Sequence, residues 1–150
     1  MKTALITGAT SGIGRATARI FAKHQYRLVI CGRREDRLTE LQDEFSHLTK
    51  VHTLNFDVRD KNAVAESIKS IPKDFSNIDV LINNAGNAHG LDPIENGDVD
   101  DWDAMIDINV KGLLYVSKEV ISGMVGRKSG HIINIGSIAG KEIYPNGNVY

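Results

Sequence analysis

The segment Thr7-Gly8-Ala9-Thr10-Ser11-Gly12-Ile13-Gly14 directly follows a short apolar run at residues 2–6 and directly precedes a helical pattern. Glycine lets the backbone turn sharply and pass close to a ligand. The free amide groups at the start of the following helix, together with the helix dipole, favour a bound anion. The segment therefore predicts a strand, a tight turn and a helix that together hold a phosphate group.

The glycine spacing is G-x-x-x-G-x-G, which differs from the dinucleotide fingerprint G-x-G-x-x-G and from the P-loop. No Lys-Ser/Thr pair closes the turn, which argues against a nucleoside triphosphatase. The alternative is a turn that is merely rich in glycine. In the helix that follows, a mostly apolar strip recurs at helical spacing, and we expect it to face a sheet: Ile13, Ala16, Thr17, Ile20 and Phe21.

The composition is that of one ordinary globular domain. The 150 residues are 41% hydrophobic and 25% charged, and 18 Lys+Arg against 19 Asp+Glu give a net charge of -1. No general field favours nucleic acid or an anionic membrane, and no run approaches the roughly 18 apolar residues that span a bilayer. The N-terminus lacks the apolar region of a signal peptide, and the single cysteine, Cys31, allows no disulfide framework. We expect a cytoplasmic protein.

Short apolar runs alternate with helical patterns along the whole chain. The runs predict strands at residues 2–6, 27–31, 51–56, 78–82 and 131–135. Such alternation is typical of an α/β protein whose parallel sheet is covered by helices on both faces. With right-handed crossovers, it predicts one domain, residues 1–150, built on a doubly wound parallel sheet with strand order 3-2-1-4-5.

A long helix is predicted from about residue 100 to Met124. Its apolar arc is wider than contact with one sheet requires. We expect the outer part of this arc to meet another subunit, so that the protein is a homo-oligomer, either a dimer or a tetramer. The arc comprises Trp102, Met105, Ile106, Val110, Leu113, Leu114, Val120, Ile121 and Met124.

Ligands of doubly wound sheets bind beyond the carboxyl ends of the strands, where the strand order reverses. In this chain that point lies between the first and fourth predicted strands. Five strand ends converge on it, and we expect a single ligand crevice there. The segments concerned are residues 8–14, Arg33 with Arg34, Asp57, residues 84–86 and Ser137.

Arg33 and Arg34 follow the glycine turn by about 20 residues, where an NAD site would place an acid on the ribose 2′-hydroxyl. Arginine matches phosphate oxygens, so the pair favours NADP over NAD. The alternative is a solvated basic start to the next helix. Cations at a helix N-terminus oppose the helix dipole, however, which supports a bound anion.

Asp57 and Val58 are positioned to bind and cover an adenine edge, although an aspartate at a strand end is also a common turn former. Asn84, Ala85 and Gly86 allow a ligand to approach the backbone closely. Asn109 is a poor helix former within the long helix, and a tolerated polar residue is the alternative there.

Ser137 and Tyr150 are the candidate chemical pair. A tyrosine can exchange a proton with a carbonyl or alcohol oxygen while a serine hydroxyl holds that oxygen. A free tyrosine titrates near pH ~10, and lowering this toward 7 costs on the order of 4 kcal/mol, which one ammonium about 4 Å away can supply. Such a lysine would lie one helical turn after Tyr150.

No metal site is expected. Cys31 lies in an apolar run and is interpreted as a buried core thiol. The histidines show no paired ligand spacing. They are His24, His47, His52, His89 and His131.

Taken together, these residues resemble the short-chain dehydrogenase/reductase family. Thr7–Gly14 is similar to its cofactor turn, and Asn83–Gly86 to its second signature. Asn109, Ser137 and Tyr150 match the catalytic asparagine, serine and tyrosine in order and spacing. The resemblance covers all 150 residues and implies a Rossmann fold and NAD(P)-dependent interconversion of an alcohol and a carbonyl compound.

The resemblance also implies roles for individual residues. Tyr150 would be the acid/base, Ser137 would orient the substrate oxygen, and Asn109 would support a water-linked proton relay. The implied cofactor contacts are Gly8, Ala9, Thr10, Ser11, Gly12, Ile13, Gly14, Arg33, Arg34, Asp57, Val58, Asn84, Ala85, Gly86 and Tyr150.

Residues 130–150, with Asp101, Trp102 and the turn at Gly32, look most like the subgroup that oxidises 3-hydroxy acids such as serine or allo-threonine with NADP. The family pattern continues with a lysine four residues after its tyrosine and then with further strands. We therefore expect these residues to be the N-terminal portion of a longer enzyme. The alternative is a non-catalytic dinucleotide-binding module that lacks the active-site lysine. A nucleic-acid-binding role lacks a basic patch and stacking aromatic residues.

Overall fold

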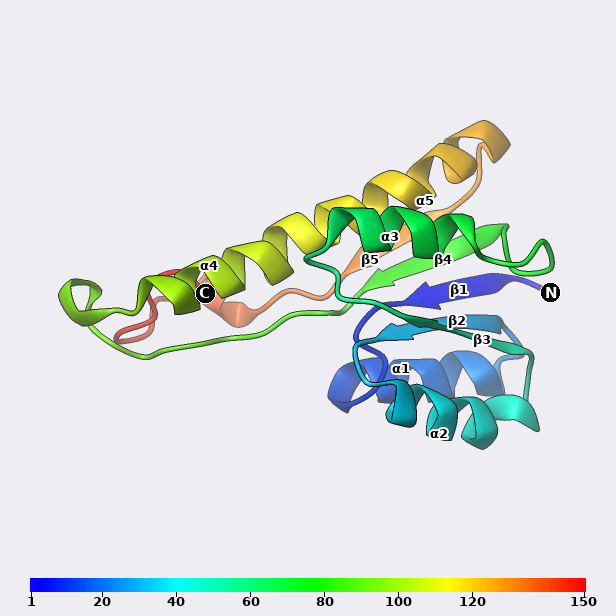
Figure 1. Cartoon of the computed structure of the whole chain (residues 1–150), viewed down its shortest axis with the longest axis horizontal. Coiled ribbons are helices and arrows are strands. Elements are labelled where there is room, and N and C mark those ends of the chain that lie inside the picture. Colours follow the sequence, from blue (N-terminus) through cyan, green and yellow to red (C-terminus); the bar gives the residue numbers. More distant parts are fainter.

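Five parallel strands form one sheet in the order β3-β2-β1-β4-β5. The structure, a computed structural model, describes residues 1–150 (Figure 1). The predicted doubly wound sheet and its strand order are confirmed. The strands are β1 (Thr3–Ile6), β2 (Arg27–Gly32), β3 (Val51–Asn55), β4 (Ile78–Asn83) and β5 (His131–Asn134).

Helices cover both faces of this sheet (Figure 1). Helices α1 (Gly12–Lys23) and α2 (Glu35–Ser46) pack on one face. Helices α3 (Lys61–Lys69) and α5 (Leu113–Arg127) pack on the other. Each helix joins two parallel strands, so the turns that follow the strands all lie at the same edge of the sheet.

The core is divided into two layers by the sheet, because successive side chains of a strand point to opposite faces. Leu5 and Val29 belong to the layer beneath α3 and α5, together with Val64 and Val116. The neighbouring strand residues belong to the layer beneath α1 and α2: Ala4, Ile6, Leu28 and Ile30. Since β1 and β2 are buried on both faces, they read in the sequence as continuous apolar runs.

Only part of the predicted inward strip of helix α1 meets the core. Phe21 is partly buried against the layer beneath α1 and α2, whereas Ile13, Ala16 and Ile20 are exposed. Ile13 and Ile20 are 62% and 57% exposed, whereas Gly14, Ala18 and Ala22 are buried. These small residues recur every four positions and let the helix lie close to the strands. At Gly14 an added Cβ would lie only 2.3 Å from the carbonyl oxygen of Gly8.

The long helical segment begins with α4 (Val99–Ile106), one residue before the predicted start, and the Asp98 carboxylate accepts a hydrogen bond from the Asp100 amide at 2.9 Å. A π-helical turn, Asp107–Gly112, then leads directly into α5. Only part of the predicted apolar arc is buried. Its outward members are 40–57% exposed, namely Ile106, Val110, Leu114 and Ile121. No helix in the structure is long and apolar enough to cross a bilayer.

We expect Gly14→Ala to lower the free energy of unfolding by about 1–3 kcal/mol, the usual cost of overpacking. Gly126→Ala in α5 is the matched control, because nothing lies within 4 Å of a Cβ added there. It should stabilise the protein by about 0.5–1 kcal/mol through helix propensity. Urea denaturation of both variants tests this, and equal effects at the two glycines would contradict the close packing of α1.

Cys31 should be inert in the folded protein. The side chain is 1% exposed, and this burial raises the pKa of the thiol far above its usual range. Thiolate is the reactive form. We expect alkylation by iodoacetamide at pH 8 to be at least about 100-fold slower in the native protein than in urea, because it requires opening of the core. Comparable rates in the two states would contradict this assignment.

Candidate active site

A cleft with a volume of about 1260 Å³ opens at the carboxyl ends of the strands. It exceeds the roughly 300–1,000 Å³ of ordinary small-molecule pockets, so it can accept an extended ligand. Its walls come from the segments that follow all five strands and from the π-helical turn. The sequence-based expectation of one crevice at this edge is therefore confirmed.

Most of the predicted site residues line this cleft. They are Gly8, Thr10, Ser11, Gly12, Ile13, Arg33, Arg34, Asp57, Val58, Asn84, Ala85, Gly86, Asn109, Ser137 and Tyr150. Ala9 and Gly14 do not. Ala9 is fully buried and its amide donates to the carbonyl oxygen of Cys31 at 3.0 Å, while Gly14 packs against Gly8. Both residues pack behind the turn in this structure, and their expected contacts with the cofactor stay predictions.

The turns after β1 and β4 are joined by four hydrogen bonds. The Thr7 hydroxyl accepts from the backbone amides of Asn84 and Ala85, each at 3.0 Å. The Asn84 side-chain amide donates to the carbonyl oxygens of Thr7 and Gly8 at 2.9 and 3.1 Å. Gly8 has a φ of +62°, and an added Cβ would meet the Ala85 backbone at 2.9 Å, so glycine is required there. The floor of the cleft is thus fixed.

The first turn of α1 is open to an anion. Ser11 precedes the helix in an extended conformation and makes no side-chain cap, and no acidic residue lies in the first turn. Gly12, at a φ of +50°, has nothing within 4 Å of an added Cβ. Free amides at a helix N-terminus, without a competing carboxylate, are suited to binding a phosphate group.

The charged side chains that line the cleft are three arginines and one aspartate: Arg33, Arg34, Arg59 and Asp57. Arg33 is 63% exposed and its Nη1 lies 3.7 Å from the Asp57 carboxylate. Arg34 donates to the Thr10 hydroxyl at 3.2 Å. This end of the cleft is therefore positive, in keeping with the predicted phosphate-binding role of the arginine pair.

Arg59 is a cleft residue that the sequence analysis missed. Its guanidinium donates to both carboxylate oxygens of Asp57, with the shortest distance 2.7 Å. Burial raises the pKa of Asp57, but the hydrogen bonds from Arg59 outweigh burial and the pKa is lowered overall. The signal in the sequence is the Asp-x-Arg spacing after β3, where the Asp57 carboxylate also accepts from the Arg59 amide at 3.0 Å.

The other end of the cleft holds neutral polar groups. Asn109 lies in the π-helical turn; its Oδ1 accepts from the Asn87 amide at 2.9 Å and its Nδ2 donates to the Asn87 carbonyl at 2.8 Å. The Ser137 hydroxyl accepts from the Ala139 amide at 3.2 Å. Tyr150 is 42% exposed and lines the same cleft. The structure therefore brings all three predicted catalytic residues to one cleft.

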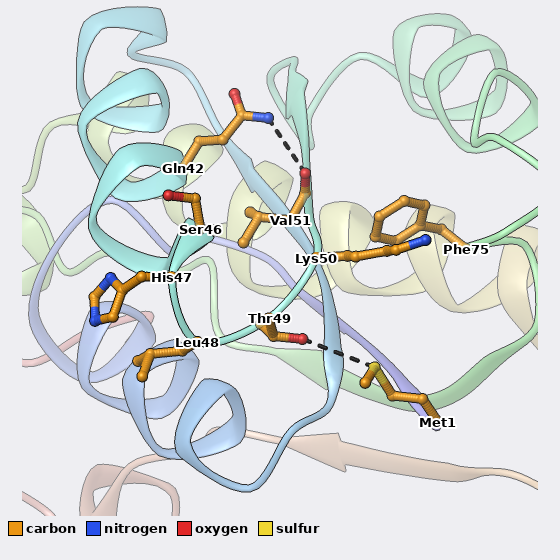
Figure 2. Close-up of a pocket in the computed structure, with 9 residues that line it drawn as sticks. All are labelled: Met1, Gln42, Ser46, His47, Leu48, Thr49, Lys50, Val51 and Phe75. Atoms are coloured by element: carbon orange, nitrogen blue, oxygen red, sulfur yellow. Dashed lines mark hydrogen bonds between the residues drawn. The ribbon is translucent and has the colours of Figure 1, made fainter.

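A second, more open hollow of about 560 Å³ lies at the opposite edge of the sheet, near the start of β3 (Figure 2). Its lining includes Met1, Lys50 and Phe75, and the Gln42 side chain donates to the Val51 carbonyl at 3.2 Å across it. It contains none of the predicted site residues. No group of three or more His, Cys, Asp or Glu side chains in the structure is placed to hold a metal ion.

Comparison with known proteins matches residues 2–150 to the family model described as short chain dehydrogenase. The chain is 46% identical over 146 residues to the NADP-dependent 3-hydroxy acid dehydrogenase YdfG of Escherichia coli O6:H1, covering 97% of this chain and 58% of that protein. It is 47% identical over 147 residues to sulfoacetaldehyde reductase 2 of Chromohalobacter salexigens, with the same coverage.

Solved structures give the same result. The closed form of a serine dehydrogenase complexed with NADP+ superposes with a TM-score of 0.93 at 46% identity, covering 99% of this chain and 59% of that chain. Serine dehydrogenase from Escherichia coli gives 0.92 at 45% identity, covering 99% and 68%. The chain spans about 58% of the length of the curated relatives it matches. Because the family model extends over almost every residue and the relatives share the sheet, the chain belongs to the short-chain dehydrogenase family.

Proposed function

We propose that this chain is the NADP-binding and acid/base part of an oxidoreductase that interconverts a secondary alcohol and its carbonyl compound. The observation that carries the proposal is that the open helix N-terminus, the arginines and the Ser137–Tyr150 pair line one cleft. The relatives named as NADP-dependent and a neighbour complexed with NADP+ support the choice of cofactor.

The residues present fit NADP in both charge and shape. The cleft-lining arginines and Asp57 leave two positive charges at one end, and a phosphate monoester carries about -1.5 to -2 at pH 7. Arg33 is exposed and only loosely paired, so it is available to a 2′-phosphate. The amides before α1 would hold the pyrophosphate. When bound, the cofactor supplies or accepts the hydride.

Tyr150 exchanges the proton of the substrate oxygen, and Ser137 orients that oxygen by a hydrogen bond. The contacts of Asn109 support a positioning role, beside the proton relay that the family resemblance implies. Both ends of its side-chain amide are bonded to the Asn87 backbone, so the side chain holds the segment after β4 against the π-helical turn. Any part in proton transfer is in addition to that positioning role.

The proposed substrate is a small 3-hydroxy acid such as serine or allo-threonine. The names of the first relatives and of the serine dehydrogenase structures support this class. The sulfoacetaldehyde reductase is equally similar in sequence and widens the class to small anions with a different acid group. A screen should therefore contain both 3-hydroxycarboxylates and sulfonates.

We further propose that residues 1–150 form the N-terminal Rossmann portion of a longer single-domain enzyme, since they match relatives over only 58% of their length.

The exposed apolar side chains on the outer side of the long helix support assembly into a homodimer or homotetramer. The free, buried Cys31 and the absence of any other cysteine are consistent with a reducing cytoplasm.

Arg33→Ala should weaken NADPH binding by about tenfold or more and leave NADH binding within about twofold, because a charge-assisted bond to the 2′-phosphate is worth ~1.5–3 kcal/mol. The readout is a fluorescence titration of the protein as encoded by its gene with NADPH and NADH. A matched control is Arg19→Ala, since Arg19 is exposed outside the cleft. An unchanged preference in Arg33→Ala would refute the assigned phosphate contact.

Tyr150→Phe should lower kcat for oxidation of serine with NADP+ by about 10²–10⁴-fold, the usual contribution of general acid/base catalysis. NADPH affinity should change far less. Tyr144→Phe removes the same hydroxyl group outside the cleft and should keep full activity. Reduced-nicotinamide absorbance follows the reaction. Tight NADPH binding with no turnover of any alcohol or sulfonate would instead favour the non-catalytic module.

A further inference from the structure

We propose that Arg59 determines the preference for NADP over NAD without contacting the 2′-phosphate: by neutralising Asp57, it leaves Arg33 free for that phosphate. Asp57 lies within reach of both arginines, so the two compete for one carboxylate. The inference rests on the proposed NADP-binding function. It assigns a role to Arg59, which belongs to none of the sequence motifs described above.

Arg59 binds the Asp57 carboxylate more strongly than Arg33 does. Its Nε donates to Oδ1 and Oδ2 at 3.1 and 3.0 Å, and its Nη2 donates to Oδ2 at 2.7 Å. The Arg59 backbone amide adds a bond to Oδ1 at 3.0 Å. Forked bonds between a guanidinium and a carboxylate are among the strongest side-chain hydrogen bonds. Both oxygens of Asp57 are therefore occupied from the side of Arg59.

Arg33 is left with a weak contact. Its Nη1 lies 3.7 Å from Asp57 Oδ2, beyond hydrogen-bond distance, and the side chain is 63% exposed. Without Arg59, Arg33 would be the nearest cation to a half-buried carboxylate that is 26% exposed. The 2′-phosphate would then have to displace Asp57 from Arg33 before binding it. It would also face an uncompensated negative charge.

The other charges around Arg59 do not replace this effect. Asp107 is the further acid that acts on Arg59. Its carboxylate is already bound by Lys111, four residues along the helix, at 2.7 Å. Arg34 is turned to the Thr10 hydroxyl. Arg59 is thus the only side chain that forms close hydrogen bonds to the Asp57 carboxylate. If Arg59 is removed, the nearest remaining cation is Arg33, which would then pair with Asp57.

The test measures the ratio of the dissociation constants for NADH and NADPH, because contacts common to both nucleotides cancel in that ratio. The protein as encoded by its gene is titrated at low salt, where surface charges are least screened. Arg59→Ala and Arg59→Gln should each lower the ratio by about fivefold. Asp57→Asn/Arg59→Ala should restore it to within about twofold of the wild-type value, since no acid remains to hold Arg33.

Arg19→Ala is the control, because Arg19 is similarly exposed (48% against 42%) and similarly paired, to Glu44 at 2.6 Å, but lies outside the cleft. Its ratio should stay at the wild-type value. A normal ratio in both Arg59 variants would overturn the inference. So would a lowered ratio that the double variant fails to restore, because Arg59 would then bind the phosphate itself. If the wild-type protein does not prefer NADPH, the proposed cofactor is wrong, and the inference about Arg59, which depends on it, is wrong as well.

Discussion

The close contact between the turns after β1 and β4 is the constraint on which the rest of the site depends. These strands are neighbours in the sheet but lie far apart in the chain. No side chain fits at Gly8, where the Ala85 backbone and the Asn84 side chain are too close, or at Gly14, where the Gly8 backbone and the Asn84 side chain are too close. The Thr7 hydroxyl and the Asn84 amide then close the contact with hydrogen bonds. The direction in which α1 leaves the sheet, and with it the open helix N-terminus, follows from this junction.

The cleft divides its chemistry between two ends. Every charged side chain that lines it comes from the turns after β2 and β3. The end near Asn109, Ser137 and Tyr150 is built from neutral groups. A proton acceptor or donor at that end is therefore not held in a fixed ion pair with the arginines, and charge recognition and proton transfer can be adjusted by different substitutions.

Much of the fold could be predicted from the sequence because it depends on patterns along the chain. The alternation of apolar runs and helical segments, with right-handed crossovers, was enough to predict the strand order. The rule that ligands bind at the carboxyl ends of the strands was enough to predict the position of the cleft. The buried side of α1 could not be predicted in the same way. Hydrophobicity favours Ile13 and Ile20, but the fully buried residues of α1 are the small ones, Gly14, Ala18 and Ala22. Arg59 was missed although the Asp-x-Arg spacing is visible in the sequence, because that spacing alone does not show that the turn directs both side chains into the cleft.

The π-helical turn at Asp107–Gly112 allows the chain to be shortened by one residue without a change in the orientation of the helices on either side of it. A π turn closes its hydrogen bonds over one more residue than an α turn. One residue can therefore be removed within it, and the turn can relax to α-helix while Val116, Val120 and Met124 stay against the sheet. Asn109 would lose its bonds to Asn87 in the same step. In this part of the molecule a deletion can spare the scaffold and remove the site, so alignment gaps here are more informative about chemistry than about architecture.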